Sequence, residues 1–343
     1  MPLPHSQARV VFGAGSTARL GEELDALGMT RVLLMTTPGR SQALAAIRQA
    51  LGHRVVGMCD RAALHVPFDR VREAVAEVDR LSPDALVAVG GGSAIGLAKA
   101  VALERQLAIV AVPTTYSGSE MTGIWGITDG EQKRTGRDAA AAPRVVVYDP
   151  ELTLTLPRDV SAASGMNAMA HAVEALYAAD AGPIATSAGD KAIRLLAQAL
   201  PRVVARPNDL DARTLALQGA HAAGVALSLA SMGLHHKICH VLGGTFGLPH
   251  ALTHAAVLPH VVAFNAPDAP LAMERIANAL GAAEAASALA ALNQTLGLHS
   301  TLADLGLRPS DVNRSAALIV SSSYPNPRPV NETNVRALLL GAL

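Results

Sequence analysis

The sequence predicts an α/β domain followed by an all-α domain, and three observations support this. Before about residue 155, short apolar runs of strand length alternate with helix-like segments; after it, the strand signals stop. Half of the 343 residues are hydrophobic and only 16% are charged, which is enough apolar material for two large cores. We therefore predict a mostly parallel α/β domain over residues 1–157 and an all-helical domain over residues 158–343.

The predicted strands are continuous apolar runs. Such runs are typical of strands that helices cover on both faces, and strands that alternate with helices predict a parallel sheet. The runs are RVLLMTT (31–37), ALVAVGG (85–91), LAIVAVP (107–113) and RVVVYDP (144–150), and the helix-like segments between them cover residues 41–52, 68–81 and 93–103.

The second half of the chain reads as consecutive helices. Ala- and Leu-rich helical patterns run to the end and are broken at residues 182–183, 207–208, 247–249 and 266–267 by Gly, Pro and Asn. The segment LPRDVSAASG (156–165) marks the change from one pattern to the other.

Composition excludes several classes of protein. Lys+Arg and Asp+Glu balance at 28 each and aromatic residues make up 3%, so we expect no nucleic acid partner. Two cysteines, Cys59 and Cys239, form neither a disulfide framework nor a Cys-rich zinc site. The first residues lack the pattern of a signal peptide, and the longest apolar stretch, residues 222–234, is too short to span a membrane. We expect a cytoplasmic protein without a membrane partner.

A glycine-rich loop follows the predicted strand ALVAV (85–89). Residues 90–93 (GGGS) end the strand and begin a helix. Glycines let the backbone approach a ligand closely, and the N–H groups at a helix N-terminus suit a pyrophosphate. The alternative interpretation is an ordinary strand-to-helix turn.

A hydroxyl-rich loop, TTYSGSE (114–120), follows the next strand. Ligands bind at the carboxyl ends of parallel strands, so the two loops together favour a Rossmann-like nucleotide site over two unrelated turns. The predicted cofactor-binding residues are Thr36, Gly91, Gly92, Ser93, Thr114, Thr115 and Ser119.

Four histidines with helical spacing form the candidate active site. His171 lies four residues after Asn167, His236 and His240 are four apart, and His250 follows in GLPHALTH. Any one of them alone reads as structural, but the set on apolar helices favours an active site. The spacing is not the HExxH zinc motif. We interpret His235, His254 and His260 as supporting residues, and Cys239 as a buried thiol.

These segments, in order, resemble the iron-containing alcohol dehydrogenase superfamily. The resemblance covers nearly the whole chain and implies the architecture that this superfamily shares with dehydroquinate synthases. It includes GGGSAIGLAKA (90–100), VPTTYSGSE (112–120), YDPELTLTLP (148–157), SGMNAMAHAVEALY (164–177), HHKICHVLGGTFGLPHALTHAAVLPHVVAFN (235–265) and YPNPRPVNETNVRALL (324–339).

Several departures are similar to the maleylacetate reductase branch. Family members bind a divalent metal with one Asp and three His, and the matching positions here are Asn167, His171, His236 and His250. Gly96 stands where the family usually has Asp, and the loop PTTYSGSE is one residue short. A neutral amide is a poorer ligand than a carboxylate, so we expect no tightly bound metal.

The branch resemblance implies NAD(P)H-dependent reduction of the C=C bond of maleylacetate to 3-oxoadipate in aromatic-compound breakdown. Such a reaction passes through an enolate, a weaker base than the alkoxide of an alcohol dehydrogenase, and hydrogen-bond donors can stabilise it. The resemblance implies that His240 is the proton donor. It also implies that His236 or His250 holds the enolate oxygen, with His171 in support.

The expected cofactor is NADH, with NADPH also accepted. The strand ending in residues 35–41 carries no acid that would repel a 2′-phosphate; Thr36, Thr37 and Ser41 suit a ribose and Arg40 a phosphate. The substrate is a dicarboxylic enone, which we expect in an interdomain cleft of a homodimer. Its predicted contacts are Tyr116, Ser117, Asn167, Lys237, Tyr324 and Asn326, with charge from Lys237 or Arg137.

Three other functions remain open on the sequence. They are a metal-dependent alcohol or polyol dehydrogenase of the same superfamily, a lyase like the dehydroquinate synthases, and a non-enzymatic nucleotide-binding protein. The lyase lacks its expected density of Lys and Arg near the histidines, and the intact histidine set argues against the non-enzymatic alternative.

Overall fold

The computed structural model describes residues 8–39, 44–130 and 132–343. The chain divides between Leu156 and Pro157 into an N-terminal α/β unit and a C-terminal helical unit. The predicted fold class is confirmed: strands and helices alternate in the first unit, and the second is built from helices.

The α/β unit is built on a parallel sheet. Within the described ranges it has six strands in the order β1-β8-β5-β4-β2-β3, and every neighbouring pair is parallel. This order places the carboxyl ends of β2, β4 and β5 side by side. The strands are β1 (Arg9–Phe12), β2 (Val32–Met35), β3 (Val55–Cys59), β4 (Ala85–Gly90), β5 (Ala108–Pro113) and β8 (Val145–Tyr148).

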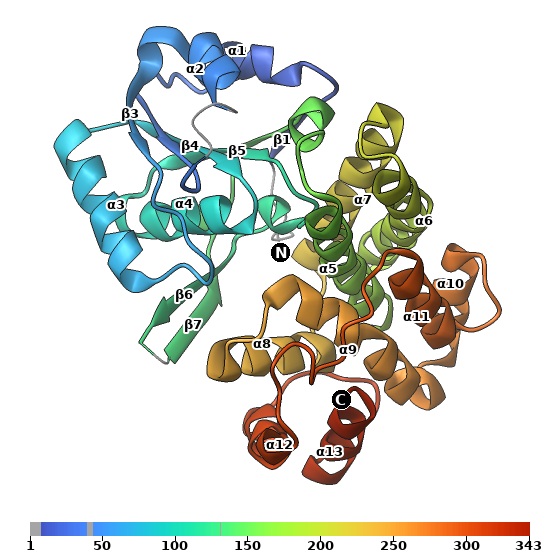
Figure 1. Ribbon diagram of the computed structural model, residues 1–343. Coiled ribbons are helices and arrows are strands. Elements are labelled where there is room, and N and C mark those ends of the chain that lie inside the picture. Colours follow the sequence, from blue (N-terminus) through green and yellow to red (C-terminus); the bar gives the residue numbers. More distant parts are fainter. Residues whose placement is uncertain (1–7, 40–43, 131) are drawn as a thin grey trace. The chain divides into compact units, whose positions relative to one another are not determined.

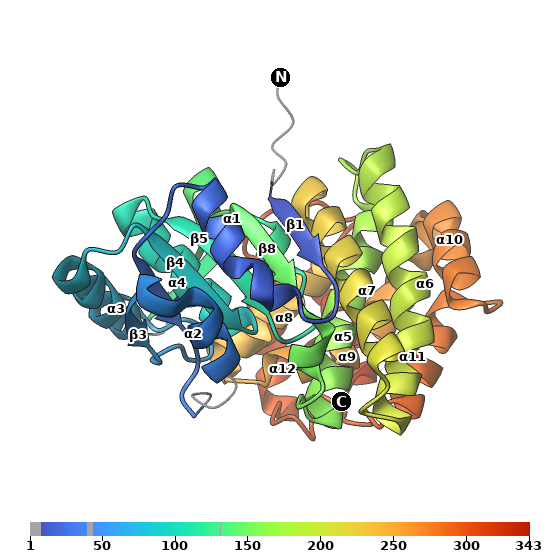
Figure 2. The same ribbon diagram turned by 90° about the horizontal axis from the view of Figure 1, so that it is seen from above.

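Helices cover both faces of this sheet, as the continuous apolar runs predict. Helices α1 (Leu20–Ala26) and α2 (Ala45–Leu51) lie on one face, and α3 (Phe68–Leu81) and α4 (Gly92–Arg105) on the other (Figures 1 and 2). Alternate strand residues pack against the first pair, among them Leu34, Val87 and Val110. Burial on both faces explains why these strands are apolar without interruption.

A separate hairpin, β6 (Ile124–Asp129) and β7 (Gln132–Arg137), was not predicted from the sequence. Its strands pair antiparallel, with Trp125 opposite Gly136. A Cβ atom at Gly136 would lie 2.6 Å from the Trp125 ring, so the indole needs glycine opposite it. The sequence of β7, QKRTGR, has none of the apolar residues that revealed the other strands.

The C-terminal unit packs helices around the central helix α5, which is buried from Ser161 to Tyr177. Small residues permit this close packing: a Cβ atom at Gly165 would lie 2.3 Å from a Leu200 methyl group. The helices are α5 (Arg158–Tyr177), α6 (Pro183–Ala205), α7 (Leu210–Leu229), α8 (Leu234–Phe246), α9 (His250–Asn265), α10 (Pro270–Leu280), α11 (Ala285–Thr295), α12 (Val312–Val320) and α13 (Glu332–Gly341).

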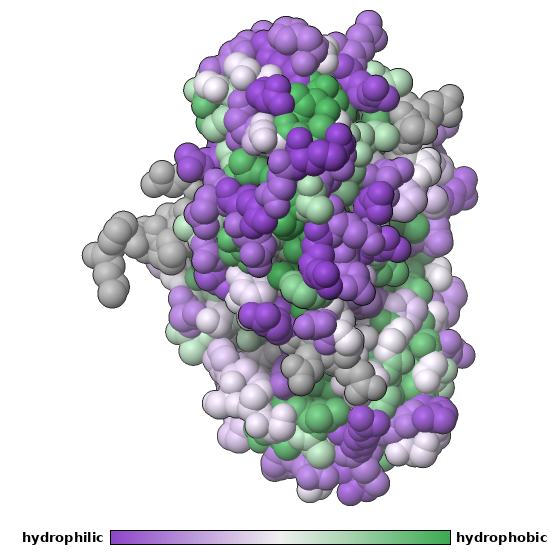
Figure 3. Space-filling model, turned by 90° about the vertical axis from the view of Figure 1, so that its left-hand side faces the viewer, coloured by the Kyte–Doolittle hydropathy of each residue, from purple (hydrophilic) through white to green (hydrophobic). Residues whose placement is uncertain are grey.

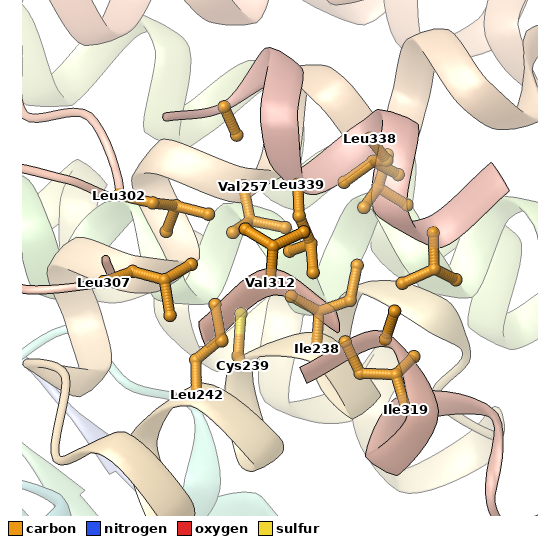
Figure 4. Close-up of a cluster of buried hydrophobic side chains, with 14 of the residues drawn as sticks. Ile238, Cys239, Leu242, Val257, Leu302, Leu307, Val312, Ile319, Leu338 and Leu339 are labelled. Atoms are coloured by element: carbon orange, nitrogen blue, oxygen red, sulfur yellow. The ribbon is translucent and has the colours of Figure 1, made fainter. Parts of the chain in front are cut away.

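A second core anchors α8, the helix that carries two of the candidate histidines. Ile238, Cys239 and Leu242 of α8 pack with apolar residues from α9, α12 and α13 (Figure 4). One face of α8 is therefore fixed by hydrophobic burial, which leaves another face for the histidines.

The surface is mixed in polarity. Seen from the side of α3, hydrophilic residues are interspersed with smaller hydrophobic areas (Figure 3), and α3 carries local ion pairs such as Arg80–Glu77. Within the described residues, no single helix is long and apolar enough to cross a membrane; only α7 and α8 taken as a pair, bent by 100° at their junction, meet the length and composition requirement.

Candidate active site

The N-terminus of α4 is the candidate cofactor site of the α/β unit. Gly91 is the N-cap, and no side chain caps this end among the residues described. A Cβ atom at Gly92 would meet nothing within 4 Å. The prediction that the N–H groups of this first turn bind a ligand phosphate stays a prediction.

The hydroxyl-rich loop lies directly against this turn. The backbone N–H of Thr114 donates to the carbonyl of Gly90 at 3.0 Å. A Cβ atom at Gly91 would lie only 2.8 Å from Oγ1 and Cγ2 of Thr115. The two loops therefore pack together at neighbouring strand ends, and glycine is needed at position 91 because of this approach.

Thr36 directly follows β2, which neighbours β4 in the sheet. Its side chain is buried, and its Oγ1 atom has no hydrogen-bond partner within the described part of the chain. Arg40 and Ser41, which the sequence suggested for the ribose end of the cofactor, lie outside the described residues.

A buried lysine, which sequence reasoning missed, holds the loop that follows β5. The Nζ atom of Lys99 donates to the carbonyl oxygens of Ser119 (2.7 Å) and Ile124 (2.9 Å), and contacts Ser119 Oγ at 3.2 Å. The Ser119 hydroxyl, predicted to bind the cofactor, therefore faces Lys99. Burial lowers the pKa of Lys99 to about 7.

We expect Lys99→Met to change the pH dependence of stability. The folded-state pKa is about 7 and the ordinary value is 10.5, so the unfolded chain binds more protons between these values. The lysine's burial penalty then shrinks as the pH rises. The unfolding free energy of the unmodified chain, relative to the variant, should increase by about 2 kcal/mol from pH 7 to pH 9, measured by urea titration. Relative to Lys191→Met, which removes an exposed lysine, the unfolding free energy of the unmodified chain should not increase in this way. An equal increase relative to both variants would contradict the lowered pKa of Lys99.

Tyr116 and Ser117, predicted to contact substrate, lie inside the α/β unit. Tyr116 is fully buried, and the Ser117 hydroxyl donates to Glu120 Oε2 at 3.3 Å. Tyr148 donates to the other Glu120 oxygen at 2.8 Å. Burial raises the pKa of Glu120. The substrate roles of Tyr116 and Ser117 stay predictions.

The four predicted histidines converge in the helical unit. The ring of His171 on α5 stacks on that of His236 on α8, with centroids 4.8 Å apart. His240 lies 6.2 Å from His236 and 6.5 Å from His250 on α9. His171 and His236 are buried, whereas His240 and His250 are partly exposed.

A fifth histidine, His254, lies in the middle of this cluster. Its ring is 4.9 Å from His236 and 4.5 Å from His250. Its Nδ1 atom is 3.0 Å from Nε2 of His235, and both side chains are fully buried. Burial lowers the pKa of His235 to about 3 and that of His254 well below its usual value, so both imidazoles are neutral near pH 7.

Glu174 is the main site residue that the sequence analysis missed. It lies on α5 one turn after His171 and is fully buried. Its Oε2 atom is 2.5 Å from Nδ1 of His236. The only signal in the sequence was the spacing of three residues from His171, which places both side chains on one face of a helix.

The other predicted substrate residues differ in their surroundings. Asn167 is buried, and no described residue hydrogen bonds to its Oδ1 atom. Lys237 donates to Ser322 at 2.8 Å. Asn326 exchanges amide hydrogen bonds with Asn265 of α9, at 2.7 and 3.2 Å, which is a structural use of its side chain.

The hydroxyl group of Tyr324 is predicted to contact the substrate. The side chain packs against the second core, and its buried OH group has no hydrogen-bond partner in the described ranges. Burial, together with the charge of Glu174, raises the pKa of Tyr324 to about 12, so the phenol stays protonated as a donor.

The donor set of this cluster bears on whether a metal binds. At the family positions it offers the Asn167 amide and the imidazoles of His171, His236 and His250, with no carboxylate. Among the described residues, the set whose three ligand atoms lie within 4.8 Å of one another is instead His235, Cys239 and His254. The His235–His254 hydrogen bond already joins two of these atoms. This set lacks the carboxylate of the family pattern, and the absence of a tightly bound metal stays a prediction.

Two family models match consecutive parts of the chain. The model described as iron-containing alcohol dehydrogenase matches residues 7–150, and the C-terminal model of the same family matches residues 161–343. The chain belongs to the iron-containing alcohol dehydrogenase family. The resemblance seen in the sequence is thereby confirmed, and the family is one of oxidoreductases.

Within this family, the chain is similar to proteins named maleylacetate reductase. It is 48% identical to one from Sphingobium indicum over 342 residues, which cover 100% of this chain and 96% of the relative. It is 49% identical to one from Burkholderia cepacia, covering 96% and 94%. The crystal structure of a maleylacetate reductase from Agrobacterium tumefaciens has a TM-score of 0.94 at 42% identity, covering 100% and 97%.

The description of the family favours a bound metal, in contrast to the donor set. A family described as iron-containing is at odds with our expectation of no tightly bound metal. Asn167 and the missing carboxylate are features of this chain.

Proposed function

We propose that this chain catalyses the nicotinamide-dependent reduction of the carbon–carbon double bond of maleylacetate, which gives 3-oxoadipate. The observation that carries the proposal is the full-length similarity to maleylacetate reductases. The histidine cluster, with a neutral amide at position 167, supports it chemically.

The reduction divides into a hydride step and a proton step. The reduced nicotinamide supplies the hydride, which adds to the alkene carbon β to the ketone. The π electrons of the C=C bond form a new double bond between the α-carbon and the ketone carbon, and those of the C=O bond move onto oxygen, which gives an enolate. His250, with Tyr324, holds this oxygen by hydrogen bonds, and the ring of His236 supports the pocket. His240 then donates a proton to the α-carbon and recovers it from solvent.

The dianionic substrate favours a site without a carboxylate facing it. Asn167 contributes an amide where an aspartate would repel the substrate, because like charges at close range are unfavourable. Lys237 supplies positive charge. The nicotinamide nucleotide is bound by Gly91, Gly92, Ser93, Thr114 and Thr115, and we propose that NADH and NADPH are both accepted.

The test is oxidation of NADH and of NADPH by the purified chain with maleylacetate, with the product identified as 3-oxoadipate. Parallel assays use primary alcohols and polyols with the oxidised cofactors. Turnover of an alcohol without turnover of maleylacetate would contradict the proposal. A preference for NADH above about a thousandfold would contradict the cofactor proposal alone.

We expect Asn167→Asp to bind divalent metal more tightly and to reduce maleylacetate more slowly. The new carboxylate completes a ligand set and also repels the substrate. Metal content measured on the purified proteins, with turnover before and after chelation, checks both effects. The matched control is Asn278→Asp, on α10 outside the cluster. Stoichiometric iron in the unmodified chain, with activity lost on chelation, would show that a metal is required.

A further inference from the structure

We propose that Glu174 is the positioning residue of the histidine cluster: it holds the ring of His236 and the first turn of α8 in one arrangement. The effect of Glu174 on turnover rests on the proposed function, whereas its contacts with His236 and α8 do not.

The groups around Glu174 require both of its carboxylate oxygens to be hydrogen-bond acceptors. Oε2 accepts from the backbone N–H of Gly233 at 3.1 Å and lies 2.5 Å from Nδ1 of His236. Oε1 accepts from the backbone N–H of His235 at 2.9 Å and from the Tyr177 hydroxyl at 3.3 Å. A carboxylate accepts on both oxygens, whereas an amide must place its NH₂ group against one backbone N–H. Glutamine is therefore a poor substitute although its size is nearly the same.

The contact with Glu174 selects one form of His236. Because the carboxylate is an acceptor, Nδ1 of His236 carries the proton that it donates. Nε2, the other ring nitrogen, is then the atom left to accept a hydrogen bond. The ring plane is held by His171, stacked at 20°, and by His254, which approaches edge-on at 69°. Such carboxylate–imidazole contacts set both ring orientation and tautomer.

The same carboxylate fixes the beginning of α8. No side chain of the N-cap residue, Gly233, closes this end of the helix, and Glu174 from α5 takes that place. A negative charge there is favoured by the helix dipole. Space is tight as well, since a Cβ atom at Gly233 would lie 2.7 Å from the carbonyl of Pro325 and 3.3 Å from Glu174 Oε1. His236 and His240 follow in this helix, so one side chain sets the position of both.

The first arm of the test is NMR of the whole protein labelled with ¹⁵N in histidine. We expect a hydrogen-bonded Nδ1 proton of His236 at low field, identified by its absence in His236→Asn. It should shift toward the position of an unbonded imidazole in Glu174→Gln. A His236 protonated at Nε2 rather than Nδ1 in the unmodified protein would overturn the proposal. This arm does not depend on any substrate.

The second arm is kinetic. Glu174→Gln should lower kcat for maleylacetate by about 10–100-fold and leave the KM for NADH within about twofold. In the His236→Asn background it should cause a much smaller loss of kcat, because most of its effect passes through that ring. Losses that multiply in the double variant, or a folded Glu174→Gln with unchanged kcat, would overturn the proposal.

A control separates helix capping from positioning. Asp209 also caps a helix with its carboxylate, accepting from the N–H of Ala212 at 3.0 Å at the start of α7, and it contacts no histidine. Asp209→Asn should lower thermal stability without lowering kcat; an equal loss of kcat would show that weakened capping alone explains Glu174→Gln. If the unmodified chain does not reduce maleylacetate, the proposed function fails while the NMR arm still decides the role of Glu174.

Discussion

His240→Ala should lower the turnover of maleylacetate by about 10²–10⁴-fold, the usual range for loss of a general acid. His240 is partly exposed and lies beside two other rings of the cluster, 6.2 Å from His236 and 6.5 Å from His250. Access to solvent allows it to recover a proton in each cycle, which the buried and neutral His254 cannot do as readily. Truncation removes the proton donor but no residue of the cofactor loops. NADH affinity, measured by fluorescence titration, should therefore stay nearly unchanged.

The control for this prediction is His299→Ala, which truncates an exposed histidine of the same unit. It should keep full turnover. A His240→Ala protein that folds normally and retains most of its turnover would transfer the proton-donor role to His236 or Tyr324.

Gly91→Val should raise the KM for NADH by about 10–100-fold, which corresponds to the 1–3 kcal/mol typical of an overpacked contact. Gly91 has a φ of −88°, so valine meets no backbone restriction there. The obstacle is contact, because even a Cβ atom would lie 2.8 Å from the Thr115 side chain. Either that loop or the first turn of α4 must move, and both are predicted to bind the nucleotide.

Stopped-flow measurement of NADH binding checks this result separately from turnover. The control is Gly182→Val in the helical unit, where a Cβ atom meets nothing within 4 Å and φ is −79°. Binding of NADH to Gly91→Val at the affinity of the unmodified chain would remove this turn from the cofactor site.

The strands that the sequence predicted are those buried on both faces. The apolar runs in β2, β4, β5 and β8 have helices on both faces, so periodicity was not needed to recognise them. The hairpin β6–β7 was missed because β7 is polar and its partner residue Trp125 covers a glycine instead of a hydrophobic core. That information lies in the pairing of two strands and not in either strand alone.

The candidate site was likewise predicted only in part, because only contacts between neighbours in the sequence are visible there. Helical spacing identified His171, His236 and His240, because neighbours on one helix face are visible in the sequence. Glu174 and Lys99 were missed, since a glutamate or a lysine in a helix is ordinarily solvent-exposed. Their burial depends on contacts far along the chain, such as that between Glu174 and His236, 62 residues away.

The burial of α5 has a consequence for how this site can change in evolution. Asn167, His171 and Glu174 all lie on a helix that is also the centre of the unit's packing, where a Cβ atom at Gly165 already has no room. A substitution there alters the scaffold and the chemistry together, and most such changes cost stability first. New substrate preferences are therefore more accessible through partly exposed substrate positions outside this helix, such as Lys237, where the side chain can vary while the fold persists.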